Sequence, residues 1–137
     1  KRTIKTPKVY FYDTGLVCYL TKWSSPEVAE SGAMSGALLE NFTVSEIMKS
    51  YQNAGLEPYL YFYRDRDAKE IDVIMEGDGK LCPLEIKKTA TPDKRLTRVF
   101  GVIDKSPLKL GTGAVLCMAE QFSAFDRDNL IVPIWMI

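Results

Sequence analysis

The segment from residue 70 to residue 87 constrains the fold of this chain more than any other segment. Ile71, Val73 and Met75 alternate with acidic residues, which is the periodicity of a β-strand. Asp78-Gly79 follows, a dipeptide typical of two-residue hairpin turns because both central positions of such a turn need positive φ. The segment therefore predicts two antiparallel strands joined by a tight turn.

This turn also predicts which side chains meet across the hairpin. Counting back from the turn, Asp72 pairs with Glu85. Paired residues point to the same face, and Lys87 shares that face because side chains alternate along a strand. We therefore expect two carboxylates and one ammonium group to converge, provided that the register does not slip by one residue.

Two carboxylates placed this close together repel each other unless a cation offsets their charge. A hard divalent cation such as Mg²⁺ does so well because it takes oxygen ligands. Lys87 would then orient an attacking water or stabilise charge on a phosphate. The alternative is a solvated hairpin face with ordinary charges, but the apolar neighbours of Glu85, Leu84 and Ile86, are typical of a buried strand and favour the site.

Composition excludes several classes of chemistry. The chain has 137 residues, enough for one domain with a core, and contains no histidine. Ser-His-Asp catalysis, Cys-His catalysis and histidine metal sites are therefore excluded, and hydrolysis would have to use carboxylates, lysine and a metal. The net charge is zero, although seven basic residues face two acidic ones between residues 87 and 109. The chain as a whole is thus not a strongly basic nucleic-acid binder.

The three cysteines, Cys18, Cys82 and Cys117, lie far apart in apolar stretches and are expected to be buried reduced thiols. No run of apolar residues is long enough to cross a membrane. Both observations predict a cytoplasmic protein without membrane partners. Because the first residue is Lys1 and not methionine, we expect the chain to be a piece of a longer protein.

The rest of the chain predicts an α/β domain with a mixed central sheet flanked by helices. The expected elements are a strand at 9–12, a helix capped by Asp13 and Thr14, a loop at 23–36, a helix at 36–52, strands at 59–63 and 80–88 with Pro83 at an edge or irregular position, a helix starting at Thr91-Pro92, a loop at 106–113, a buried strand at 114–119, a polar stretch at 121–129 and a last strand at 130–137. The strands at 80–88 and 114–119 should be parallel because a helix joins them.

Two helices carry further candidate residues. Glu40 lies on the apolar face of the helix at 36–52, four residues before Val44, where a glutamate without a partner is costly to bury. Either it forms a salt bridge to a core lysine or arginine, or it points into the pocket of the two hairpin carboxylates. In the second helix, Lys94, Arg95 and Arg98 lie opposite the apolar stripe. This face is either solvated or holds a phosphate backbone.

Glu40, Asp72 and Glu85-Ile86-Lys87, in an α-β-β-β-α-β order, resemble the PD-(D/E)xK restriction-endonuclease-like superfamily. A closer resemblance covers nearly the whole chain. It rests on residues 9–16, 36–42, 45–46, 62–65, 70–72 and 83–87, which are similar to motifs in the C-terminal domain of unknown function of predicted prokaryotic AAA-type (P-loop) ATPases. Two departures are Ile71, where the superfamily motif has proline, and Lys88, where small or polar residues are frequent.

The resemblance implies a domain plan. Residues 1–22 would be the tail of a preceding winged-helix or linker segment, and residues 23–137 the endonuclease-like domain. The N-terminal ATPase domain of the same full-length chain would be a partner. Because no GxxxxGK[ST] motif occurs here, we expect no nucleotide to bind this fragment.

The resemblance also implies a function, Mg²⁺- or Mn²⁺-dependent hydrolysis of DNA phosphodiester bonds. The implied roles are catalysis by Glu40, Asp72, Glu85 and Lys87, metal binding by Asp72, Glu85 and the Ile86 carbonyl, and DNA binding by Lys88, Lys94, Arg95 and Arg98. Two alternatives stay open, a catalytically silent module that binds DNA or the ATPase domain, and a purely structural ion network. The aromatic segment 9–12 and the apolar segment 130–137 are also candidates for contacts in a homo-oligomer.

Overall fold

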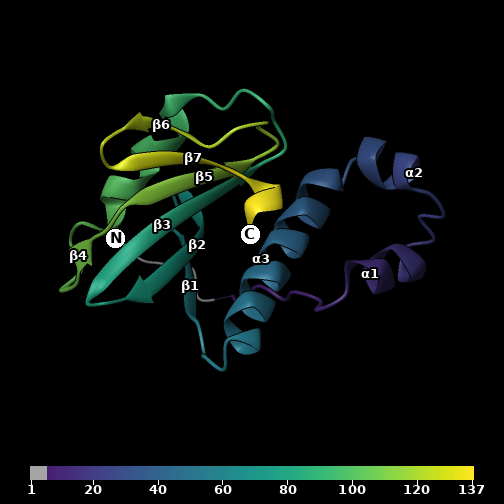
Figure 1. Cartoon of the computed structure of the whole chain (residues 1–137), viewed down its shortest axis with the longest axis horizontal. Helices are drawn as coiled ribbons and strands as arrows, with labels where there is room; N and C mark the ends of the chain where they lie inside the picture. The colour runs from purple at the N-terminus through teal and green to yellow at the C-terminus, as the bar shows by residue number, and fades with distance from the viewer. Residues whose placement is uncertain (1–5) are drawn as a thin grey trace.

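In the computed structural model, which describes residues 6–137, a mixed seven-stranded sheet carries helices on both faces (Figure 1). The elements are α1 (Thr14–Leu20), α2 (Pro26–Ser31), α3 (Ser35–Asn53), β1 (Tyr59–Arg64), β2 (Glu70–Gly77), β3 (Lys80–Lys87), the 3₁₀ helix η1 (Lys94–Ile103), β4 (Lys109–Leu110), β5 (Gly113–Cys117), β6 (Ser123–Asp126), β7 (Asn129–Pro133) and the 3₁₀ turn η2 (Ile134–Met136). The strand order is β1-β2-β3-β5-β7-β6, and β4 pairs with β3 beside β5. The predicted α/β class and mixed sheet are confirmed.

The predicted hairpin between β2 and β3 is confirmed. Gly77 pairs with Lys80 around a turn in which Asp78 has φ 51° and Gly79 has φ 70°. Both values are those that a two-residue turn of this type requires. The register continues to the pair of Val73 with Leu84, so Asp72 and Glu85 come next on their strands, as predicted.

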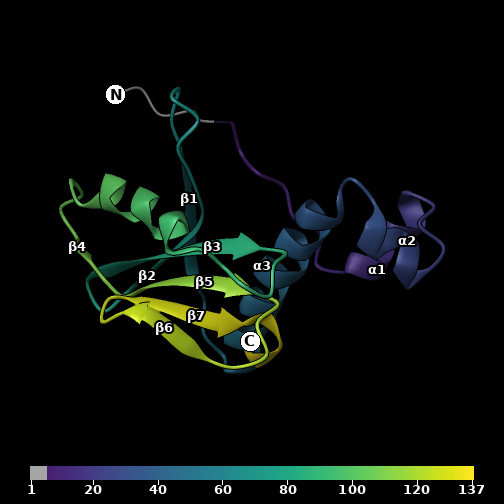
Figure 2. The ribbon, with the colours of Figure 1, turned by 90° about the horizontal axis from the view of Figure 1, so that it is seen from above.

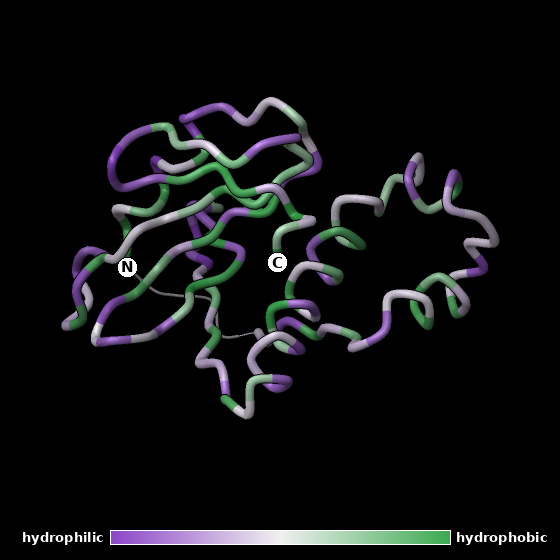
Figure 3. The backbone as a smooth tube through the Cα atoms, viewed as in Figure 1, coloured by the Kyte–Doolittle hydropathy of each residue, from purple (hydrophilic) through white to green (hydrophobic). Residues whose placement is uncertain are grey.

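The predicted parallel pairing of β3 with β5 is also confirmed, because η1 connects the two strands across one face of the sheet. All five residues of β5 are buried. The strand lies between β3 and β7, both parallel to it, while β6 closes the sheet antiparallel to β7. Figure 3 shows that hydrophobic residues concentrate in these central strands.

Helices α3 and η1 cover opposite faces of the sheet (Figure 2). Ala114 and Leu116 of β5 belong to the core cluster that contains Val44 of α3. Val115, between them, packs in a different cluster with Leu96 of η1. This division follows the alternation of side chains along a strand. The site described below lies where β2 and β3 run between these two layers.

One irregularity interrupts β2 at the candidate site. Between the pairs that Ile74 and Ile71 form with β1, one residue of β1, Phe62, lies opposite two residues of β2, Asp72 and Val73. This is a β-bulge, which re-aims the side chains beyond it. Ile71 consequently packs with Ile74 and not with Val73. The prediction that Ile71 shares a face with Val73 and Met75 was therefore wrong.

The segment before α1 differs from its prediction. Residues 9–12 were expected to form a strand, but they are an extended segment outside the sheet. The physical reason is that the backbone of Phe11 hydrogen-bonds to the Asn41 side chain of α3 and not to a neighbouring strand. We call residues 8–11 the strap. Residues 1–5 of the expected winged-helix tail lie outside the described residues.

Helix α1 is confirmed, with Asp13 as its N-cap, since the Asp13 carboxylate accepts the N–H groups of Gly15 and Leu16. The loop expected at 23–36 was wrong in part, because α2 forms within it. Ser25 caps α2 through the Val28 N–H, and proline occupies the first helical position. Both short helices lie at the N-terminal end of α3, away from the sheet (Figures 1 and 2).

Helix η1 begins later than predicted. The expected start at Thr91-Pro92 was wrong, because Asp93 is the N-cap and its carboxylate accepts the Arg95 N–H at 2.7 Å. The expected apolar stripe is confirmed in part, since Phe100 and Ile103 are buried against the sheet. Arg98 is exposed on the opposite side.

Four smaller predictions needed correction. The loop expected at 106–113 contains β4, and the polar stretch at 121–129 contains β6, because both pair with strands distant in sequence. The strand expected at 130–137 ends at Pro133 and continues as η2. Of the two positions expected for Pro83, the edge was wrong, because β3 is an interior strand. The irregular position is the one found, since Pro83 falls where the parallel neighbour of β3 changes from β4 to β5. Within residues 6–137, no helix has both the length and the hydrophobicity to cross a membrane.

Candidate functional site

Asp72 lies in the β-bulge with its carboxylate directed at β3. The side chain is buried, and its Oδ2 accepts a hydrogen bond of 2.9 Å from the backbone N–H of Ile86. This bond closes the hairpin beyond the regular ladder. It holds one carboxylate oxygen of Asp72 close to the strand that carries Glu85.

Glu85 is buried as deeply as Asp72, each residue being 8% exposed. Its Oε1 forms an ion pair of 2.8 Å with Lys87 Nζ. The same Nζ lies 3.9 Å from Asp72 Oδ2. Its Oε2 is buried and has no hydrogen-bond partner among residues 6–137. The structure thus brings Asp72, Glu85 and Lys87 together and leaves one buried carboxylate oxygen unsatisfied.

The surroundings disfavour the charged forms of both carboxyls. Burial raises the pKa of Asp72, although the Ile86 N–H and the Lys87 charge act in the opposite direction. Burial and the charge of Asp72 raise the pKa of Glu85. For Lys87, burial opposes the charged form, but the hydrogen bond to Glu85 and the charge of Asp72 outweigh it and raise the pKa. A cation between the carboxylates would relieve their repulsion.

The chemistry of these donors fits a hard divalent cation. Asp72 and Glu85 supply carboxylate oxygens, the ligand type that Mg²⁺ and Mn²⁺ prefer, and Glu85 Oε2 is the free one. Ile86 contributes its N–H to Asp72, beside the carbonyl expected as a third ligand. In the described part of the chain, no three His, Cys, Asp or Glu side chains are arranged to hold a metal among themselves. Two carboxylates are therefore the protein side chains that would hold it.

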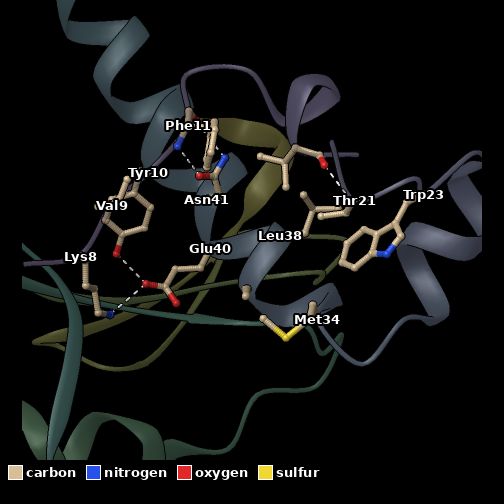
Figure 4. A pocket seen from close by; sticks show the side chains of 12 residues that line it. Lys8, Val9, Tyr10, Phe11, Thr21, Trp23, Met34, Leu38, Glu40 and Asn41 are labelled. Atoms are coloured by element: carbon tan, nitrogen blue, oxygen red, sulfur yellow. Dashed lines mark hydrogen bonds and ion pairs between the residues drawn. The ribbon is translucent and has the colours of Figure 1, made fainter. Parts of the chain in front are cut away.

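Glu40 of α3 meets the strap (Figure 4). Its Oε1 accepts hydrogen bonds from Lys8 Nζ at 2.9 Å and from the Tyr10 hydroxyl at 2.6 Å. The salt bridge foreseen as one explanation for Glu40 is therefore present. The same ammonium lies 4.0 Å from Asp72 Oδ1, so Lys8 links Glu40 to one of the two hairpin carboxylates. Burial and the hydrogen bond to Glu40 raise the pKa of Tyr10.

Lys8 and Glu70 are site residues that sequence reasoning missed. Lys8 Nζ lies 2.7 Å from Glu70 Oε1, so one ammonium joins α3 to β2. Burial opposes the charge of Lys8, but the hydrogen bonds to Glu70 and Glu40 outweigh it and raise its pKa. The alternation of Glu70 with Asp72 could have flagged Glu70. No local signal marks Lys8, which is 32 residues from Glu40.

Buried Asn41 fastens the strap to α3. Its side-chain oxygen accepts the Phe11 N–H at 2.7 Å, and its amide group donates to the Phe11 carbonyl at 3.0 Å. The strap also borders a mostly apolar pocket of about 380 Å³ between α1 and α3, seen in Figure 4. These contacts fix the strap, and therefore the backbone from which the Lys8 side chain extends.

A second, larger cavity of about 940 Å³ opens between η1 and the strands. Both Glu70 and Glu85 line this cleft. Four basic residues also line it: Lys69, Arg95, Arg98 and Lys105. Except for Arg95, which pairs with Asp93, they form no ion pair with another described residue. The cleft therefore offers free cationic groups beside the carboxylate with the unsatisfied oxygen.

Two of the expected DNA-binding residues lie elsewhere. Lys88 Nζ donates to the Glu30 carbonyl and to the Ser35 hydroxyl, at the junction of α2 and α3. Lys94 forms an ion pair of 2.8 Å with Asp126 of β6. Arg95 and Arg98 line the cleft, whereas Lys69 and Lys105 are basic residues of the cleft that were not foreseen.

Comparisons with known proteins identify a family but name no activity. Residues 35–137 match the family described as Domain of unknown function (DUF4143). The chain is 33% identical over 134 residues to an uncharacterized protein of Mycobacterium bovis and, equally, to one of Mycobacterium tuberculosis. Each alignment covers 97% of this chain and 29% of the relative, so the chain spans less than a third of these curated relatives. No solved structure matches the chain significantly.

Proposed function

The chain belongs to the DUF4143 family, and we propose that its domain is a metal-dependent nuclease that hydrolyses phosphodiester bonds of DNA. The fold we propose for it is restriction-endonuclease-like, with α3, β1, β2, β3, η1 and β5 as the core. One observation carries the proposal. The buried pair of Asp72 and Glu85 has Lys87 beside it and one carboxylate oxygen that no described residue satisfies, at a cleft lined by basic residues.

In this proposal Asp72 and Glu85 hold Mg²⁺ or Mn²⁺, which would activate a water and offset charge on the phosphate. The Ile86 N–H keeps the Asp72 carboxylate oriented. Lys87 is held by Glu85 at 2.8 Å and has donors to spare, since an ammonium carries three N–H groups. It would hydrogen-bond the attacking water or a non-bridging phosphate oxygen.

The basic residues of the cleft would hold the DNA backbone on either side of the scissile phosphate. Arg98, Lys69 and Lys105 have no ion pair within the part of the chain that the structure describes, so binding phosphate displaces no partner there. Such contacts position a nucleic acid without reading its sequence. The exposed Lys88 and Lys94 are engaged elsewhere and are not needed for this role.

The domain would act within a longer protein. The DUF4143 family is known as a C-terminal domain of AAA-type ATPases, and the chain spans only 29% of its curated relatives. We propose that an N-terminal ATPase domain of the full-length chain is the partner of this domain. ATP hydrolysis would belong to that part.

Metal binding is tested by thermal unfolding with and without Mn²⁺. A ligand present at 100 times its Kd stabilises a protein by about 2.7 kcal/mol. We expect Mn²⁺ to raise the melting temperature of the wild type but not of Glu85→Gln. Asp126→Asn, which removes a carboxylate on β6, is the matched control and should respond like the wild type.

Catalysis is tested by incubating the same proteins with single- and double-stranded DNA and Mn²⁺. Cleavage by the wild type that is lost in Glu85→Gln supports a nuclease. Metal-independent DNA binding without cleavage would refute it in favour of a catalytically silent binding module. No effect of Mn²⁺ on either protein would leave the ion pairs with a structural role only.

The cleft is tested by the salt dependence of DNA binding. Arg98→Ala and Lys105→Ala should each weaken binding and reduce the slope of log K against log salt by about 1. Lys94→Ala and Lys88→Ala are the controls and should bind like the wild type. If only the control substitutions weakened DNA binding, the DNA would bind to another face of the domain.

A further inference from the structure

The ammonium of Lys8 occupies the centre of a second group of carboxylates. It lies 2.9 Å from Glu40, 2.7 Å from Glu70 and 4.0 Å from Asp72. The Lys8 side chain is only 20% exposed. These carboxylates come from α3 and β2, which also share a hydrophobic cluster containing Val44 and Val73. A cation between these carboxylates offsets their mutual repulsion, and the Lys8 ammonium is that cation.

Several contacts hold Lys8 there (Figure 4). Tyr10, two residues along the strap, donates to the same Glu40 oxygen, and Phe11 is fixed by Asn41. Lys8 Nζ also lies 5.5 Å from the centre of the Phe62 ring, within range of a cation–π interaction. Contacts at Lys8, Tyr10 and Phe11 therefore fix the Lys8 side chain, unlike that of a solvated surface lysine.

The two halves of the acidic group differ in what satisfies them. Glu40 and Glu70 already bind the Lys8 ammonium at hydrogen-bond distance. Glu85, on the other side of Asp72, retains a buried oxygen with no partner in the described structure. A divalent cation therefore has an open ligand at Glu85, whereas at Glu40 and Glu70 it would have to displace an ammonium group.

We propose that Lys8 is a positioning residue that fills the second cation position of the site, so that the domain binds one divalent cation and not two. This inference rests on the proposed metal site at Asp72 and Glu85. Lys8 supplies the second positive charge and holds Asp72 between two cations. In this proposal Glu40, expected from the sequence to be catalytic, anchors Lys8.

The consequence is a change in metal stoichiometry when the ammonium is removed. Lys8→Met keeps the aliphatic stem but removes the cation that Glu40, Glu70 and Asp72 share. Glu40 is then left without an ion pair to any described residue, while Glu70 keeps Arg64 at 3.7 Å and Asp72 keeps Lys87 at 3.9 Å. Half-buried carboxylates that lose their counter-ion repel each other and gain affinity for any cation that fits. We expect this variant to bind a second Mn²⁺ per chain.

The experiment counts Mn²⁺ bound per chain, by equilibrium dialysis with the free ion measured by electron paramagnetic resonance. We expect one ion in the wild type, two in Lys8→Met and one in Lys8→Met/Glu40→Gln. Lys8→Arg, which restores the charge, and Lys88→Met, a distant lysine, should each bind one. A stoichiometry of two in the wild type, or no gain in Lys8→Met, would overturn the proposal.

Glu40→Gln in the wild-type background keeps the inference testable if Lys8→Met does not fold. Glutamine retains an acceptor for Lys8 and Tyr10, so this variant should still bind one Mn²⁺. Loss of that ion would make Glu40 a metal ligand and overturn the proposal. Glu85→Gln separates the two hypotheses. If wild type and Glu85→Gln bind equally, the proposed metal site fails, whereas a gain of one ion in Lys8→Met over the wild type still supports the position of Lys8.

Discussion

The attachment of the strap to α3 yields a prediction whose size follows from the structure. Asn41→Ala removes two hydrogen bonds to the Phe11 backbone, of 2.7 and 3.0 Å. Each is worth about 0.5–1.5 kcal/mol, or about 1–3 kcal/mol together. Because Phe11 is 41% exposed, water can reach its backbone afterwards, and the full penalty for a buried unsatisfied group does not apply.

Alanine is a better helix former than asparagine by roughly 0.5 kcal/mol, and position 41 is inside α3. Because α3 is helical whether the strap is bound or released, this gain does not offset the cost of releasing the strap. That cost therefore stays at about 1–3 kcal/mol. Amide hydrogen exchange at Phe11 measures this opening directly. We expect its protection to fall roughly 5- to 160-fold, as the same free energy converted at 25 °C.

Ser45→Ala is the matched control for this measurement. Ser45 is also buried on α3, but its hydroxyl donates at 2.8 Å to the Phe42 carbonyl of the same helix. Removing it should leave exchange at Phe11 unchanged. Equal protection of the Phe11 amide in Asn41→Ala and in the wild type would refute the reasoning, because the strap would then be held by other contacts.

Two other predictions concern the sheet. The pKa of Asp126 is lowered to about 2 by hydrogen bonds from Lys94, Asn129 and the Asp128 N–H. Its contribution to stability is therefore present above its unfolded pKa, near 4, and is lost as the pH falls toward 2. Urea unfolding at pH 4.5 and pH 3 should show a smaller acid loss for Asp126→Asn than for the wild type, and an equal loss would contradict the pairing. Gly113→Ala would bring a Cβ to 2.6 Å from the buried Phe100 ring, and we expect a cost of about 1–3 kcal/mol in urea unfolding, against no more than a small change for Gly36→Ala, where the added Cβ meets nothing.

Most sequence predictions that depend on neighbouring residues were correct, whereas most that depend on contacts between distant segments were not. The hairpin was predicted correctly because positive φ at Asp78 and Gly79 is a local requirement, and its register follows by counting. The helix at 36–52 was predicted because apolar residues recur with helical spacing over a long segment. In the structure it runs from Ser35 to Asn53. The convergence of Asp72, Glu85 and Lys87 needed no more than this local information.

The errors came from contacts between distant segments. The bulge at Asp72 and Val73 leaves the sequence alternation unchanged, because it appears only when β1 supplies one residue against two. Strand β4 is two residues long, and β6 reads as polar, so pairing and not composition makes them strands. The strap looked like a strand because its aromatic residues have high β-propensity, but Asn41 takes its backbone groups.

For the site, the sequence by itself determined which carboxylates and which lysine the hairpin brings together, since strand periodicity and turn geometry act over a few residues. Only the tertiary structure decided which cations satisfy them. Lys8 reaches Glu40 across 32 positions of the chain, and the basic lining of the cleft combines Lys69 before β2 with Arg98 and Lys105 in and after η1. Such neighbours are set by the packing of α3 and η1 on opposite faces of the sheet, and packing across a sheet leaves no periodic signal in the sequence.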